Sequence, residues 1–100
     1  MKKGIIELII LKCLKNKDMY AYEINKIINK TIDTNESTVY VNLKKLVENK
    51  YLIMYQKNSL VEINRKYYQI TSLGMQRLNS LLEEWNNFYL TVNQLLDNIL

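Results

Sequence analysis

Hydrophobic positions in the first half of the chain recur with helical spacing in three separate segments. Residues 4–15 are apolar nearly all round, which predicts a helix that is buried from two sides. Residues 20–32 place isoleucines on one face and lysines on the other, which predicts an amphipathic second helix. Asn35 is suited to cap a third helix that runs to about Asn49.

The third predicted helix has two faces of different character. One face is an apolar stripe that can pack on the first two helices, and it consists of Val39, Leu43, Leu46 and Val47. The opposite face is mostly polar and includes Ser37, Thr38, Val41, Asn42 and Lys45. Folding alone gives no reason for an exposed valine there, so this second face is a candidate contact surface.

After Lys50 the hydrophobic period changes from helical to alternating. Residues 51–57 and 65–70 are rich in tyrosine and β-branched side chains, which predicts two strands in a hairpin around residues 58–64. We therefore predict a mostly α fold with a small β-hairpin (α+β). Its element order is that of a winged helix-turn-helix, in which the third helix enters the major groove of DNA.

The last segment predicts one long helix, capped by Thr71 or Ser72 and running to Leu100. Its apolar residues step alternately by four and three, which is the heptad pattern of a coiled-coil seam. The seam consists of Leu78, Leu82, Trp85, Tyr89, Val92, Leu96 and Ile99, and a second stripe of Leu81, Phe88 and Leu95 lies beside it.

This apolar surface is larger than the rest of a small domain can cover, which predicts a homodimer. The last helix should pack on its mate and on the first helix of the partner chain, so Ile6 and Ile10 join the expected interface. We divide the chain into a winged-helix DNA-binding domain, residues 1–70, and a dimerisation helix, residues 71–100.

Charge is distributed unevenly between these two parts. Residues 1–70 contain 13 basic and 7 acidic side chains, a net charge of +6, whereas residues 71–100 contain 1 and 3, a net charge of −2. A basic body predicts a polyanionic partner, here double-stranded DNA, and Lys44 is expected to contribute general phosphate attraction.

Several classes of function lack the residues they need. The chain has no histidine to act as a general base or metal ligand, no glycine-rich phosphate loop, and adjacent Glu83 and Glu84 diverge around a helix. We expect no enzyme, no cofactor and no metal. No apolar run is long enough to span a bilayer and a single cysteine forms no intrachain disulfide, so we expect no membrane partner and a cytoplasmic location.

Each residue type on the second face of the third helix suits contact with DNA. Ser37 and Thr38 can hydrogen-bond phosphate oxygens beside the backbone amides of the helix start. Val41 can pack on a thymine methyl group and Asn42 can pair with adenine. Lys45 can reach a guanine edge or a phosphate.

Three stretches, "MYAYEI" (19–24), "STVYVNLKKLVENKYL" (37–52) and "RKYYQITSLG" (65–74), resemble the signature segments of PadR-like transcriptional regulators, in the short subclass with one C-terminal dimerisation helix. The resemblance implies a homodimeric repressor of a pseudo-palindromic operator, which in some members is released by small aromatic compounds. It also implies that Tyr22, Thr38 and Tyr40 lie near the DNA backbone, and that Arg65 and Lys66 form the basic edge of the wing.

The sequence departs from the family pattern at two places. It has "LVEIN" where glycine and proline often precede the wing motif, and Ala21 where glycine is usual. The first change predicts a stiffer wing tip, and the second should be tolerated in a helix.

Alternatives remain open at this level. Tyr40 can instead be half-buried core, and Lys2 and Lys3 can touch phosphate or simply be solvated. Trp85, at the middle of the last helix, can clamp a flat aromatic effector together with Phe88 and Tyr89, or can simply fill the dimer core. The rival functions are a DNA-organising or partition-type adaptor without an effector, and a protein-binding module.

Overall fold

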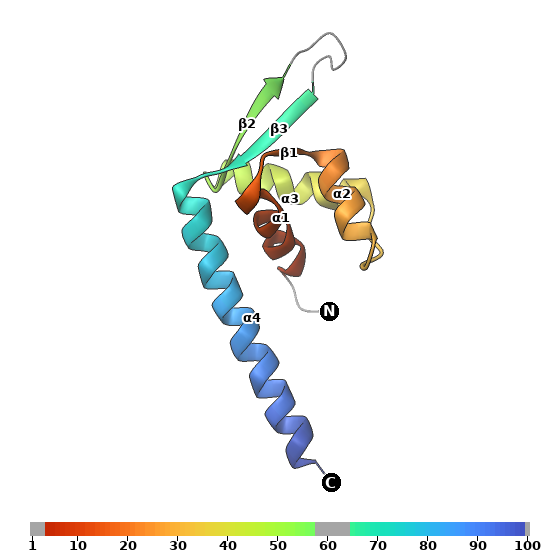
Figure 1. The fold of residues 1–100 in the computed structure, drawn as a ribbon, viewed down its shortest axis with the longest axis vertical. Helices are drawn as coiled ribbons and strands as arrows, with labels where there is room; N and C mark the ends of the chain where they lie inside the picture. The colour runs from red at the N-terminus through yellow and green to blue at the C-terminus, as the bar shows by residue number, and fades with distance from the viewer. Residues whose placement is uncertain (1–3, 58–64, 100) are drawn as a thin grey trace.

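The computed structural model describes residues 4–57 and 65–99, which form four helices and a three-stranded antiparallel sheet (Figure 1). In chain order the elements are α1 (Ile5–Asn16), β1 (Met19–Tyr20), α2 (Ala21–Asn29), α3 (Glu36–Glu48), β2 (Leu52–Lys57), β3 (Arg65–Ile70) and α4 (Ser72–Asn98). The predicted α+β winged-helix fold is confirmed. The expected wing tip, residues 58–64, lies outside the described residues.

Helix α1 occupies the centre of the molecule, as its apolar sequence predicted. Its Ile10 and Leu11 have no exposed surface at all. The helix contacts α3, α4, α2 and strand β3, so it is enclosed from several sides. The largest fully buried side chains are Ile10, Leu11, Leu14, Ile24, Leu43, Leu52, Leu78 and Val39.

The sheet has the strand order β1-β3-β2, and strand β1 was not predicted. In β1, Tyr20 lies opposite Tyr67 of β3, and Tyr67 lies opposite Tyr55 of β2. Residues that lie directly opposite each other on paired strands point to the same face of the sheet, so these three tyrosines share one face. Leu52 and Tyr68 lie on the other face and are buried in the core.

Helix α2 is shorter than predicted and ends at Asn29. Its first residue, Ala21, is buried and helical, so the methyl group at this position is accommodated. Tyr22 is exposed, so Ala21, and not Tyr22, faces the core.

The first turns of α4 are attached firmly to the wing. The Thr71 hydroxyl donates to the carbonyl oxygen of Lys50 at 2.7 Å and accepts from the amide of Gly74 at 3.0 Å. A Cβ at position 74 would overlap the carbonyl oxygen of Tyr51, so only glycine fits there without movement. Arg77 forms a two-pronged ion pair with Glu7 of α1, with Nε to Oε1 at 2.8 Å.

Beyond this attachment, α4 extends away from the rest of the chain and gives the molecule an elongated shape of 62 × 28 × 21 Å (Figure 1). Its buried residues are Gly74, Leu78 and Leu81, all in the first half of the helix. The core therefore continues past residue 70. Within the described residues, no helix, α4 included, is both long enough and apolar enough to cross a membrane.

Candidate nucleic-acid interface

Helix α3 has the two faces that its sequence predicted. Val39, Leu43 and Leu46 are buried against the core, and Asn35 caps the helix by accepting a hydrogen bond from the amide of Thr38 at 2.9 Å. The opposite surface lacks a cover from the described chain, and its exposed residues are Ser37, Tyr40, Val41, Lys44 and Lys45. Val41 is 53% exposed, an unusual position for a valine in the middle of a helix.

Two of the polar residues predicted to contact DNA are engaged with their own helix. The Thr38 hydroxyl donates to Oδ1 of Asn35 at 3.1 Å, and the Asn42 amide donates to the carbonyl oxygen of Thr38 at 2.9 Å. Both side chains are half-buried. Thr and Asn side chains commonly make such local bonds to backbone and cap groups. The Thr38 hydroxyl must exchange its bond in order to donate to DNA, whereas the Asn42 amide keeps a second N–H group and its carbonyl oxygen for a base.

A groove lies where α2, α3 and the wing meet, and we call it the wing groove. The groove has a volume of about 340 Å³ and is lined by Tyr20 of β1, Ala21 and Tyr22 of α2, Tyr40 of α3, and Arg65, Lys66 and Tyr68 of β3. Tyr40 is 52% exposed, which contradicts the alternative that it is a half-buried core residue.

Arg65 and Lys66 border the wing groove together although they point to opposite faces of the sheet. The reason is the length of β1, which ends at Tyr20 opposite Tyr67. Beyond that point no strand among residues 4–57 and 65–99 pairs with β3 on its β1 side, and the chain turns into α2. Both basic side chains therefore reach the open edge.

A row of tyrosine rings crosses the sheet beside this groove. Tyr20 stacks on Tyr22 with ring centroids 6.2 Å apart and contacts Tyr67 at 5.5 Å, and Tyr67 stacks on Tyr55 at 5.8 Å. The guanidinium carbon of Arg65 lies 4.3 Å from the centroid of the Tyr20 ring. Tyr20 was not among the residues predicted for this surface, although the tyrosines at positions 20, 22 and 67 were a visible signal.

The far end of the row is tied to the loop after α1. The Tyr55 hydroxyl donates to Oδ2 of Asp18 at 2.6 Å. This hydrogen bond to the carboxylate raises the pKa of the Tyr55 phenol above its ordinary value. Tyr55 therefore stays protonated and holds β2 against the α1–β1 connection.

The residues predicted for a dimer interface divide into three groups by their burial. Ile10 and Leu78 have no exposed surface in the single chain, so they pack within their own core and offer nothing to a partner; this corrects the sequence assignment. Ile6, Leu82 and Val92 are half-buried. The exposed seam residues are Trp85, Tyr89, Leu96 and Ile99.

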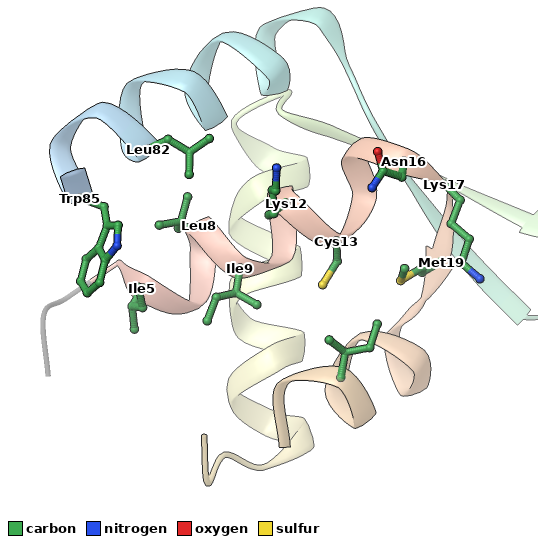
Figure 2. A pocket seen from close by; sticks show the side chains of 11 residues that line it. Ile5, Leu8, Ile9, Lys12, Cys13, Asn16, Lys17, Met19, Leu82 and Trp85 are labelled. Carbon is green, nitrogen blue, oxygen red and sulfur yellow. The ribbon is translucent and has the colours of Figure 1, made fainter. Parts of the chain in front are cut away.

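A second, larger groove lies along α1, between α4 and Ile27 in the last turn of α2, and we call it the α1–α4 groove (Figure 2). It has a volume of about 700 Å³, and Figure 2 shows Ile5, Leu8 and Ile9 of α1 facing Leu82 and Trp85 of α4. Its wall is apolar, with Lys12 and Lys17 among the residues that border it.

The three residues predicted to hold an aromatic effector are placed differently. Trp85 lines the α1–α4 groove, and the Phe88 ring lies 6.2 Å from it at a tilt of 39°. Tyr89 is exposed and does not line the groove. Cys13 also lines it, and burial raises the pKa of its thiol, which favours the neutral form.

Known proteins resemble this chain in both sequence and fold. Residues 10–80 match the sequence model of the transcriptional regulator PadR-like family. A PadR family transcription regulator from Clostridium difficile R20291 is 32% identical, with 93% of this chain and 99% of that chain covered and a TM-score of 0.86. A PadR-like transcriptional regulator from Bacillus cereus strain ATCC 14579 is 30% identical, with 97% and 96% covered and a TM-score of 0.86.

A more distant structure is that of Bacillus subtilis PadR, which was solved in complex with operator DNA. It is 22% identical, with 78% of this chain and 46% of that chain covered and a TM-score of 0.70. At this identity the likeness shows the shared fold.

Proposed function

The chain belongs to the PadR-like family of transcriptional regulators, and on this premise we propose that it binds double-stranded DNA as a homodimer and represses transcription from a pseudo-palindromic operator. In this role the two copies of α3 enter successive major grooves, with their centres about 34 Å apart, one turn of the duplex. A chromosomal target of this kind places the protein in the cytoplasm.

The observation that carries this proposal is the uncovered face of α3. Val41 is exposed one turn before Lys44 and Lys45 on the helix that a winged fold presents to DNA, where its methyl groups can pack on thymine. Lys45 lies one turn further along the same face, within reach of a base edge or a phosphate. The wing groove adjoins this face through Tyr40 and adds Arg65 and Lys66. Together they form one continuous basic surface.

The proposed dimer is supported by two apolar surfaces that have no cover in the single chain. The second half of α4 leaves Tyr89, Leu96 and Ile99 more than half exposed, and the α1–α4 groove leaves an apolar hollow along α1. A partner's α4 has the shape and chemistry to fill that hollow. The basic rim of the groove also complements the acidic α4 segment, whose net charge is −2.

We further propose that a small, flat aromatic compound releases the protein from DNA by binding beside Trp85. The indole lines the apolar groove and lies next to Phe88, at the joint between α4 and α1. A ligand there shifts the tilt of the two α3 helices only as far as it binds the released arrangement more tightly. Quenching of Trp85 fluorescence by a panel of planar dyes tests this point, and quenching by none of them rejects it.

The test of the main proposal begins by selecting bound sequences from a pool of random duplexes. Hydroxyl-radical footprinting of a selected sequence should then give two protected stretches one helical turn apart, and sedimentation should give a dimer. A single protected stretch, or a monomer at the concentrations used, would contradict the proposal. Protection that spreads cooperatively along the duplex would favour the DNA-organising adaptor.

A further inference from the structure

We infer that the wing groove holds one phosphate of the DNA backbone and that Tyr20, to which no role was assigned, is the residue that positions Arg65 in it. The inference rests on the proposed function. It makes Arg65 a phosphate contact of the wing and not a residue that reads the minor groove.

The first argument is the chemistry of the groove. Arg65 and Lys66 bring positive charge to one side, and Tyr22 and Tyr40 bring phenol groups to the other. Among the described residues that line the groove, none is acidic. Cations with hydroxyl donors suit a phosphate, which accepts hydrogen bonds through every exposed oxygen.

The second argument is location. The groove begins at the N-terminal end of α2 and reaches Tyr40 on the exposed side of α3. A duplex whose major groove contains α3 has its sugar–phosphate backbone along the edge of that groove, beside the start of α2 and the wing. Arg65 borders this opening as the first residue of β3, at the end of the strand nearest the wing tip.

The third argument is how Arg65 is held. An arginine on a sheet edge has many rotamers, and placing it over one phosphate costs the loss of that freedom. The Tyr20 ring lies 4.3 Å from the guanidinium carbon and is itself fixed between the rings of Tyr22 and Tyr67. The cation–π contact thus orients the guanidinium before DNA arrives.

The test is a double-mutant cycle read by fluorescence anisotropy on a labelled duplex of mixed sequence. Arg65→Gln should weaken binding and lower the slope of log affinity against log salt by about one. Tyr20→Leu should weaken binding ~2- to 5-fold, the size of an exposed cation–π contact. Tyr20→Phe keeps the ring and should restore wild-type affinity. In the Arg65→Gln background, Tyr20→Leu should have no further effect.

A matched control is Lys57→Gln on β2. It removes one charge from the other strand of the wing, and Lys57 lies over Tyr67 without lining the wing groove. Tyr20→Leu should keep its full effect in the Lys57→Gln background. Equal losses from Tyr20→Leu with and without Arg65 would overturn the inference, because Tyr20 would then act on the fold or on DNA directly.

Sequence dependence gives a second way to reject it. A phosphate contact loses the same affinity on A·T-rich and G·C-rich duplexes when Arg65 is replaced, whereas minor-groove insertion loses more on A·T-rich DNA. A loss confined to A·T-rich DNA would overturn the inference. Wild-type protein that binds no duplex at low salt would reject the proposed function as well, whereas wild-type binding with unaffected variants rejects this inference alone.

Discussion

The wing groove and the α1–α4 groove differ in the properties that select a partner. The wing groove is bordered by two cations and by phenol groups, and it is the smaller of the two. The α1–α4 groove has roughly twice the volume and apolar walls, with cations such as Lys12 and Lys17 at its border. An anion suits the first, and a helix or a flat apolar molecule suits the second.

Both grooves arise where an element ends or extends beyond its neighbours. The wing groove exists because β1 stops after two residues and leaves the edge of β3 open. The α1–α4 groove exists because α4 crosses α1 and continues past it, so that the two helices diverge along an apolar surface (Figures 1 and 2). The core determines which surfaces remain uncovered, and the residues on those surfaces determine what they bind.

The largest effect is expected from a charge placed on the exposed apolar seam of α4, because this seam is part of the proposed dimer interface. Leu96 is 58% exposed, so Leu96→Asp should leave the single chain folded. In the proposed dimer it buries an unpaired carboxylate, which should raise the dimer dissociation constant by ~100-fold or more, about 3 kcal/mol. Sedimentation equilibrium measures this directly.

Gln94→Asp is the matched control, because it adds the same charge two residues away and off the seam. It should leave the dimer constant nearly unchanged. A Leu96→Asp protein that dimerises as tightly as wild type would show that this part of α4 is not the interface.

The second test concerns the packing of the first turn of α4 on the α3–β2 connection. Gly74→Ala introduces a methyl group against the carbonyl oxygen of Tyr51 and the side chain of Ile70, so α4 must shift away from the backbone at Tyr51. We expect the free energy of unfolding to fall by about 1–3 kcal/mol. Chemical denaturation at a fixed protein concentration measures it, since dimerisation makes stability concentration-dependent.

Ser80→Ala provides the comparison, because Ser80 is exposed on the same helix and alanine favours helix. It should be neutral or slightly stabilising. If Gly74→Ala were equally neutral, the packing of α4 against Tyr51 would be looser than it is in the structure.

The long elements were predictable from the sequence because their periodicity is local. The caps at Asn35 and Thr71 and the two strands of the hairpin followed from short patterns. Strand β1 did not, since two residues carry no period and the strand exists only through its pairing with β3. A heptad pattern likewise does not say which chain covers it, which is why Leu78 was assigned to a partner. The all-round apolar sequence of residues 4–15 does not say so either, which is why Ile10 was assigned in the same way.

The candidate site was predictable in its members and not in its arrangement. Tyr22, Tyr40, Arg65 and Lys66 were all named, but their meeting in one groove depends on where β1 ends. The local bonds of Thr38 and Asn42 were foreseeable from their spacing of three or four residues to a cap or carbonyl group. The position of Tyr20 against Arg65 required the sheet register.

A smaller effect separates base reading from phosphate attraction on α3. Lys45→Gln should weaken binding to a selected operator by about 1–3 kcal/mol if Lys45 contacts a base, and should weaken binding to mixed-sequence DNA less. Lys44→Gln should weaken both equally. Anisotropy titrations on the two duplexes give, for each variant, the ratio of its affinity for the operator to its affinity for mixed-sequence DNA.

Lys15→Gln on α1 is the control for loss of one charge outside the proposed surface. It should change both affinities only slightly. Equal losses for Lys45→Gln on operator and mixed DNA would assign Lys45 to phosphate and leave sequence reading to its neighbours on α3.

The smallest expected effect comes from Cys13, which lines the α1–α4 groove and has no counterpart in the wing groove. Burial raises the pKa of its thiol, so at neutral pH less of the reactive thiolate is present than in a free thiol, and alkylation by iodoacetamide should be several-fold slower than that of glutathione. The rate should rise with pH over a higher range than for glutathione, because the thiolate forms only as the raised pKa is approached. If a partner's α4 fills the groove, the monomeric Leu96→Asp protein should react faster than the dimer at the same pH. Equal rates in the two proteins would mean that the seam of α4 and the hollow beside α1 do not meet in the dimer, and that each needs a different partner.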